Sequence, residues 1–156
     1  MSQETSVKQE GAMLHRSLTL PNEIDAISEM SIFIDTICEE LGFDMMTTMN
    51  LNLAIEEAVV NVVNYAYPKG TYGEVNLDVQ ADNQKFTIVI RDSGTPFDPT
   101  KQKEVDTTLS AEERPIGGLG IHLVRQIMDK ISYQYTDKQN ILTLEKIINN
   151  KENKTL

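Results

Sequence analysis

The stretch NLNLAIEEAVVNVVNYAY, residues 50–67, determines how the rest of this 156-residue chain is interpreted. Its apolar residues recur at helical spacing on most sides, which predicts a largely buried α-helix. Four polar side chains fall on one face, within a sector of roughly 60° when successive residues are placed about 100° apart. These side chains are Asn50, Glu57, Asn61 and Asn64. Because buried polar groups without hydrogen-bond partners are costly, we expect this face to bind a ligand.

Glu56 provides an internal comparison, since it directly precedes Glu57 but points about 100° away from it. We expect Glu56 and Asn52 to form the solvent edge of this helix. A lone glutamate on a helix is usually just solvated. The three carboxamides that share the face of Glu57 favour a role in a site for this residue instead.

The charge balance excludes several classes of partner. The chain carries 24 acidic and 14 basic side chains, which gives a formal net charge of −10. This charge repels phosphate backbones and anionic lipids, and no local basic patch offsets it. The longest apolar runs are far too short to span a bilayer, and residues 1–11 lack the features of a signal peptide. We therefore expect a cytoplasmic protein that binds neither nucleic acid nor membrane.

Few residues suit a transition metal or a disulfide. Cys38 is the only cysteine, and His15 and His122 are the only histidines. An internal disulfide and a cysteine-based zinc site are therefore excluded, and a transition-metal cluster is disfavoured. We expect Cys38 to be a core residue and His15 to lie at the surface of a strand.

Alternation of apolar residues predicts five strands, and helical periodicity predicts three helices. Between them, residues 92–117 contain three prolines and no sustained period, which indicates a functional lid or a disordered loop. The expected strands cover residues 13–20, 74–80, 85–91, 131–136 and 141–147, and the expected helices cover residues 22–41, 44–67 (capped by Asp44) and 117–128.

This order of elements predicts an α+β fold. A mainly antiparallel sheet built from hairpins, with helices on one face, is a two-layer α/β sandwich. We expect residues 1–11 to be a flexible N-terminal arm and residues 149–156 to be a polar C-terminal tail. Residues 12–148 then form a single domain, with residues 95–117 as its lid.

Two further segments carry signals that a simple core does not require. DSGTPFD, residues 92–98, follows a predicted strand, and GGLG, residues 117–120, begins a predicted helix. Four of the eight glycines of the chain lie in these two segments. Glycine lets the backbone approach a ligand closely, and the free N–H groups of a helix start can bind phosphate. No lysine-containing phosphate loop of the GxxxxGK[ST] type is present, so a nucleotide would be held in this other way.

In their order and spacing, the three segments resemble the motifs of the GHKL superfamily of ATP-binding domains, which have the Bergerat fold. Within it, they resemble those of the RsbW-like proteins, small serine kinases that act as anti-sigma factors. The resemblance extends from about Met13 to Ile147. It implies ATP and Mg²⁺ as cofactors.

The resemblance also implies roles for individual residues. Glu57 corresponds to the general base, and Asn61 corresponds to an ATP-binding residue that coordinates Mg²⁺. Asp92 corresponds to the residue that binds the adenine amino group, and Gly94 corresponds to the glycine that leaves room for the base. The other ATP-binding positions implied are Asn64, Asp98, Arg114 of the lid, and Gly117, Gly118, Leu119 and Gly120, which correspond to the phosphate-binding box.

Three positions depart from the family pattern. The relatives usually carry histidine at the position of Asn64, and their lid arginine lies at the position of Ile116, which leaves Arg114 as the candidate. The Gly-Thr pair often found in the last hairpin is replaced by Gln139-Asn140. These departures bear more on the kinase activity than on ATP binding.

Two functions follow from the resemblance. The first is an ATP- and Mg²⁺-dependent serine protein kinase that phosphorylates a small antagonist protein and also binds a sigma factor or similar regulator. The alternative is a non-catalytic, ATP-sensing switch module that binds its partner in one nucleotide state. A homodimer is a further expectation. The catalytic half of a sensor histidine kinase fits poorly, because residues 22–41 contain no histidine to accept a phosphoryl group.

Overall fold

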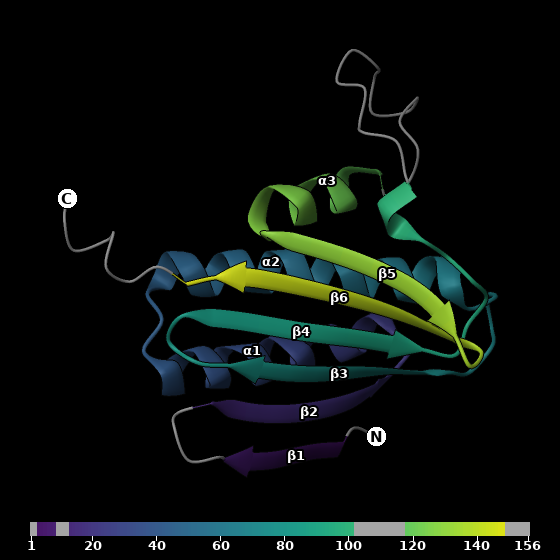
Figure 1. The fold of residues 1–156 in the computed structure, drawn as a ribbon. Helices are drawn as coiled ribbons and strands as arrows, with labels where there is room; N and C mark the ends of the chain where they lie inside the picture. The colour runs from purple at the N-terminus through teal and green to yellow at the C-terminus, as the bar shows by residue number, and fades with distance from the viewer. Residues whose placement is uncertain (1–2, 9–12, 102–117, 149–156) are drawn as a thin grey trace.

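The computed structural model describes residues 3–8, 13–101 and 118–148 of the chain. These residues form one six-stranded antiparallel sheet with the strand order β1-β2-β3-β4-β6-β5 (Figure 1). The strands are β1 (Gln3–Lys8), β2 (Leu14–Pro21), β3 (Glu74–Ala81), β4 (Lys85–Asp92), β5 (Lys130–Thr136) and β6 (Gln139–Ile147). The helices are α1 (Ile27–Leu41), α2 (Met45–Asn61) and α3 (Gly118–Ile127), with short helical turns η1 (Ile24–Ala26), η2 (Val62–Ala66) and η3 (Pro99–Lys101).

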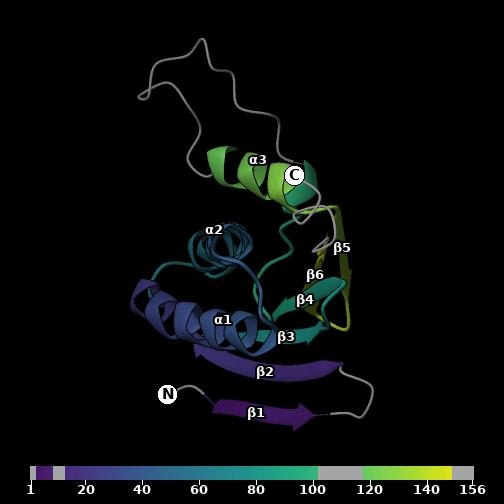
Figure 2. The same ribbon diagram turned by 90° about the vertical axis from the view of Figure 1, so that its left-hand side faces the viewer.

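The helices cover one face of the sheet. α1 and α2 lie next to each other on this face, and α3 lies beside α2 (Figure 2). Alternate strand residues, such as Leu77 on β3 and Ile88 on β4, are fully buried beneath the helices. Ile34 of α1 and Ile55 of α2 are fully buried in the same core. The predicted α+β two-layer sandwich is therefore confirmed. No helix in the described ranges is long and apolar enough to cross a membrane.

The ends of α1 and α2 follow the capping signals in the sequence. Gly42 follows the last residue of α1, and its φ of 72° lies in the left-handed region that glycine adopts without a steric penalty. Asp44 precedes the first residue of α2, and its Oδ1 accepts a hydrogen bond from the backbone N–H of Thr47 at 2.8 Å. The prediction that Asp44 caps this helix is confirmed.

The prediction of a flexible N-terminal arm was wrong for residues 3–8. These residues form the edge strand β1, which pairs antiparallel with β2 from Gln3 opposite Thr19 to Lys8 opposite Leu14. Backbone groups make the ladder bonds of a strand, so an edge strand does not need alternating apolar side chains. The polar sequence QETSVK therefore carried no strand signal.

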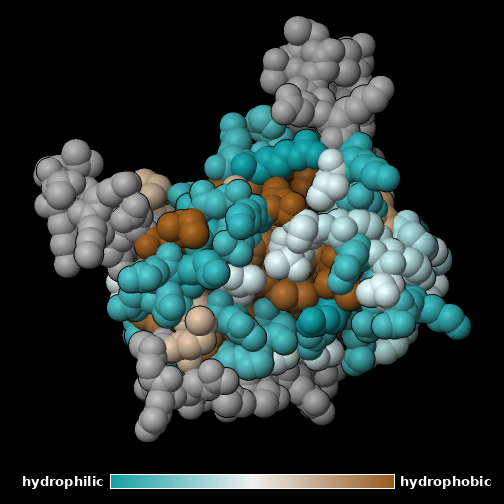
Figure 3. Space-filling view, viewed as in Figure 1, coloured by the Kyte–Doolittle hydropathy of each residue, from teal (hydrophilic) through white to brown (hydrophobic). Residues whose placement is uncertain are grey.

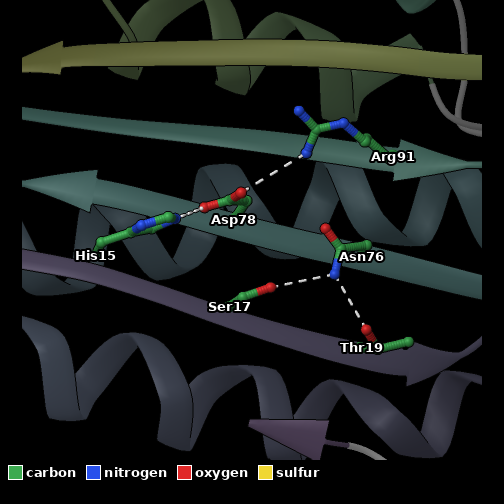
Figure 4. Close-up of polar contacts among 6 residues, drawn as sticks. All are labelled: His15, Ser17, Thr19, Asn76, Asp78 and Arg91. Atoms are coloured by element: carbon green, nitrogen blue, oxygen red, sulfur yellow. Dashed lines mark hydrogen bonds and ion pairs between the residues drawn. The ribbon is translucent and has the colours of Figure 1, made fainter. Parts of the chain in front are cut away.

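The open face of the sheet carries cross-strand polar contacts instead of a helix layer (Figure 4). His15 Nε2 lies 2.6 Å from Asp78 Oδ1, and Arg91 lies 3.8 Å from the other oxygen of the same carboxylate. Beside them, Asn76 donates hydrogen bonds to Ser17 and Thr19. Viewed from the side shown in Figure 1, this surface has hydrophilic side chains interspersed with apolar ones (Figure 3). His15 lies at the surface of a strand, as expected.

Candidate functional site

Asn61 and Asp92 lie at the wall of the same small cavity. Asn61 is the last residue of α2 and Asp92 is the last residue of β4, and each is only 3% exposed. The cavity has a volume of about 20 Å³, which is about the space that one water molecule needs. Its wall consists of Ala58, Asn61, Val62, Ala66, Ile90, Asp92, Phe97, Pro99, Tyr133, Asn140 and Leu142.

The carboxamide of Asn61 is incompletely satisfied. Its Nδ2 atom is buried and has no hydrogen-bond partner among the described residues. A buried donor in this state costs about 1–3 kcal/mol, so native structures rarely retain one without a reason. A ligand that accepts a hydrogen bond, or a half-turn of the carboxamide toward a cation, would remove this cost.

Asp92 is held by hydrogen bonds to only one of its carboxylate oxygens. Oδ1 accepts from Asn140 Nδ2 at 2.8 Å and from the backbone N–H of Gly94 at 2.9 Å. Oδ2 accepts no hydrogen bond from a described residue. Burial raises the pKa of the Asp92 carboxyl, and the two hydrogen bonds lower it in part. Asp92 is thus a fixed, buried carboxylate with one oxygen open to a donor.

Asn140 organises this part of the site, although the sequence marked it only as a departure from the family pattern. Its Nδ2 donates to Asp92 Oδ1 and, at 2.9 Å, to the carbonyl oxygen of Thr95. Its Oδ1 accepts from the backbone N–H of Phe97 at 3.0 Å and from the hydroxyl of Tyr133. Both donors and both lone pairs of the carboxamide are therefore used.

A signal in the sequence could have revealed Asn140. Along β6, the positions that point into the core are Asn140, Leu142 and Leu144, all of them buried. A carboxamide at a core-facing position of an alternating strand must find partners there. The pattern of β6 alone therefore pointed to a buried polar network at this end of the sheet.

Gly94 is required by a close approach between two backbone segments. A Cβ atom built at residue 94 would lie 2.2 Å from the carbonyl oxygen of Ala66. The same carbonyl accepts from the backbone N–H of Thr95 at 2.6 Å. The segment after β4 therefore crosses the end of η2 with no room for a side chain. This contact explains the glycine without reference to an adenine base.

Glu57 lies on α2 one turn before Asn61. Its side chain is half-buried. Burial raises the pKa of its carboxyl, and the negative charge of the neighbouring Glu56 raises it to a smaller extent. Glu56 is also half-buried, so it lies less fully in solvent than a solvent-edge position implies. The spacing of four residues places Glu57 and Asn61 on the same face of the helix.

The predicted four-residue polar face is only partly formed. Asn64 is exposed and lines a different groove, together with Asn22 and Tyr67. The physical reason is that α2 ends at Asn61 and continues as the π-helical turn η2, in which each residue advances by a smaller angle. Asn50, two turns before Glu57, lines a groove between α1 and α2. The prediction that Asn64 shares the face of Asn61 was wrong.

Asp98 has a local structural contact. Its Oδ1 accepts from the backbone N–H of Thr100 at 2.8 Å and from the hydroxyl of Thr100 at 2.5 Å. These bonds stabilise the turn η3, which places Pro99 in the wall of the cavity. The ATP-binding role that the resemblance implies for Asp98 remains a prediction.

The glycine-rich box lies at the start of a helix, as predicted. Gly118, Leu119 and Gly120 form the first turn of α3, which packs beside α2. Backbone N–H groups of a first helical turn have no partner within the helix, so a helix start can bind an anion. Arg114 and Gly117, the other predicted residues of this region, lie outside the described residues.

The fold and this arrangement of residues define a class of nucleotide-binding domain. Residues 20–146 match the family described as the Histidine kinase-like ATPase domain, and the chain belongs to this family. The resemblance inferred from the three motifs is thereby confirmed.

Proteins named as serine or serine/threonine kinases match most of the chain. The serine-protein kinase RsbW of Listeria monocytogenes is 29% identical over 147 residues, which covers 90% of this chain and 93% of the relative. RsbW of Oceanobacillus iheyensis is 29% identical over 125 residues, 76% of this chain and 78% of the relative. The serine/threonine-protein kinase BtrW of Bordetella bronchiseptica is 32% identical over 94 residues, 60% of this chain and 66% of the relative.

Proposed function

We propose that this protein is a serine protein kinase that transfers the γ-phosphoryl group of ATP, with Mg²⁺, to a small antagonist protein in the cytoplasm. The relatives that match most of the chain are named as serine-protein kinases. The observation that carries the proposal is the shared cavity of Asn61 and Asp92, with an unsatisfied carboxamide and an open carboxylate oxygen.

Asp92 and Asn61 have the chemistry that a bound nucleotide needs. Asp92 would accept a hydrogen bond from the adenine amino group through Oδ2, since Oδ1 already has two donors. Asn61 would offer its carboxamide oxygen to Mg²⁺, which takes few protein ligands and completes its shell with phosphate oxygens and water. Gly118, Leu119 and Gly120 would give backbone N–H groups to the phosphates.

The cavity is too small for a purine ring. At about 20 Å³ it has room for about one water molecule, so adenine enters only when side chains of its wall move. Phe97 and Pro99 lie in its wall on the segment after β4, so a shift of these two side chains would open it. Binding of ATP should therefore displace Phe97 and Pro99.

Glu57 is the proposed general base. The seryl Oγ of the antagonist attacks the γ-phosphorus, the bond from that phosphorus to the β–γ bridging oxygen breaks, and ADP leaves. Glu57 accepts the proton of the seryl hydroxyl. The raised pKa of its carboxyl lies closer to neutral pH than that of a free glutamate, which makes Glu57 a better proton acceptor.

Labelled ATP tests the proposal. The purified protein is incubated with γ-labelled ATP and with a cytosolic extract that contains its antagonist, and label should reach a serine of one small protein. Asn61→Ala should abolish both ATP binding and labelling. If ATP binds but no serine is labelled, the proposed kinase activity is wrong and the non-catalytic ATP-sensing switch is favoured.

Two further experiments address the proposed regulatory partners and the oligomeric state. An anti-sigma role requires that a sigma factor or similar regulator binds the protein, and the resemblance to RsbW-like proteins also implies a homodimer. Affinity capture with and without ATP, followed by mass spectrometry, identifies the regulator. Sedimentation of the purified chain gives its oligomeric state.

A further inference from the structure

A row of exposed apolar side chains runs along the outer surface of α2. Met45, Met49 and Leu53 are spaced by four residues and are 79%, 61% and 39% exposed, and Met46 beside them is 67% exposed. Side chains four residues apart lie on the same face of a helix. Large apolar side chains gathered in this way mark sites of interaction, and methionine adapts readily to a partner surface.

This row borders a groove between α1 and α2. The groove has a volume of about 420 Å³ and is lined by Ser31, Asp35, Thr48, Met49, Asn50, Asn52, Leu53 and Glu56. Asn52 fixes its shape, because Nδ2 donates to Asp35 Oδ1 on α1 at 2.7 Å and to the carbonyl oxygen of Thr48 at 3.0 Å. Asn52 is therefore a link between the helices and not the solvent-edge residue that the sequence predicted.

The charged side chains of α1 and α2 all have one sign. α1 carries four carboxylates and α2 carries two, and neither helix contains a lysine or an arginine. Asp35 and Glu56 line the groove itself. Only Glu40, at the end of α1, has an ion-pair partner, Arg16 at 2.6 Å, among the described residues of the two helices. A partner that fits this surface must therefore bring positive charge.

We propose that the groove between α1 and α2 is a docking site for an amphipathic helix of a partner protein, with an apolar face flanked by lysine or arginine. Its apolar residues would cover Met45, Met49 and Leu53, and its basic residues would pair with Asp35 and Glu56. A second copy of this chain is a poor occupant, because it would bring more carboxylates to the same place. The proposal does not depend on phosphoryl transfer.

A model peptide tests the charge and the apolar requirement together. The probe is a fluorescent synthetic helix with leucine on one face and lysine on the other, and the control peptide has glutamate in place of lysine. We expect the lysine peptide to bind the full chain and the glutamate peptide not to bind. Amide chemical shifts of ¹⁵N-labelled protein should change within Ser31–Asp35 and Thr48–Glu56.

Two variants separate docking from unspecific attraction to an acidic protein. Asp35→Asn keeps the acceptor of Asn52 but removes the charge, and Met45→Ser with Met49→Ser removes the apolar contact. Each should weaken binding about ten-fold, which is the usual effect of losing an interface anchor. Ile147→Ser, at a 48% exposed position on β6, is the matched control and should bind as the parent does.

The proposal is overturned by any of four results. The first is that the lysine peptide does not bind, and the second is that both peptides bind equally. The third is that the Met45 and Met49 variant binds as tightly as the parent, and the fourth is that the shift changes lie on other elements. Circular dichroism of each variant establishes that it is folded, so that a loss of binding is not a loss of structure.

Discussion

The carboxamide of Asn140 donates to the carboxylate of Asp92 at 2.8 Å, and the two residues lie directly opposite each other in the β4–β6 ladder. This pair joins the proposed adenine-binding carboxylate to the segment after β4, because Asn140 also bonds Thr95 and Phe97. The position of Asp92 and the path of that segment are therefore set by one side chain from a different hairpin.

Replacement of Asn140 by leucine should change the pH dependence of nucleotide binding. The hydrogen bond from Asn140 lowers the pKa of Asp92, so its loss raises that pKa further above its ordinary value of 3.8. If ATP binding needs an ionised Asp92, the affinity for ATP should fall on acidification, and it should do so at a higher pH in the variant than in the parent. Calorimetric titration of ATP from pH 4 to pH 8 measures the midpoint.

Tyr133→Phe is the control for that experiment. It removes one hydrogen bond to Asn140 but leaves the bond from Asn140 to Asp92 in place. The midpoint for this variant should stay with the parent. A parental midpoint in the Asn140→Leu variant as well would show that Asn140 does not set the ionisation of Asp92.

Asp92→Asn should stabilise the free protein at neutral pH while it weakens ATP binding. The folded state raises the pKa of Asp92, so it binds the proton more tightly than the unfolded chain does. Asp92 therefore contributes fully to stability at a pH below its pKa in the unfolded chain, and this contribution is lost as the pH rises through its pKa in the folded protein. Asparagine carries no charge at any of these pH values, so the variant does not lose stability in this way. Urea denaturation at pH 7 and at pH 3 should show a gain for the variant that is larger at pH 7.

Glu57→Gln should remove phosphoryl transfer and leave ATP binding intact, with a loss in kcat of about 10²- to 10⁴-fold that is usual for a general base. In the parent, kcat should fall at low pH with a midpoint above 4.5, because burial and Glu56 raise the pKa of Glu57. Glu56→Gln is the matched variant. It should retain activity and move this midpoint to lower pH, since it removes the charge that helps to raise the pKa.

Gly94→Ala should destabilise the fold. The new Cβ would lie 2.2 Å from the carbonyl oxygen of Ala66, a backbone atom that cannot turn aside. Overpacking of this kind costs about 1–3 kcal/mol in the free energy of unfolding, which urea denaturation measures. Ser93→Ala, at the exposed preceding residue, should be near neutral. Equal stability of the two variants would contradict the close approach.

Cys38 should be unreactive in the native protein. The thiol is buried, and burial raises its pKa to about 11, so little thiolate exists near neutral pH. Reaction with Ellman's reagent at pH 8 should be slow, and addition of denaturant should give one rapid equivalent, since Cys38 is the only cysteine. Fast labelling without denaturant would place Cys38 outside the core.

Much of the fold followed from local patterns. The alternation in β3, β4 and β6, the cap at Asp44 and the stop at Gly42 are each encoded within a few neighbouring residues. The motif spacing was also sufficient to place the chain in its family. These features depend on intrinsic backbone preferences and on which side chains avoid water, and both can be judged from the sequence.

Other features exist only because distant segments meet. Asn140 satisfies Asp92 across 48 residues of sequence, and the backbone of Ala66 excludes a side chain at residue 94. The π-helical turn after Asn61 rotates Asn64 away from the cavity, although both residues share a face on an ideal helix. β1 forms through backbone bonds to β2 that its side chains do not signal. Periodicity describes one element at a time, whereas hydrogen bonds and steric exclusion between elements are decided only when they pack together.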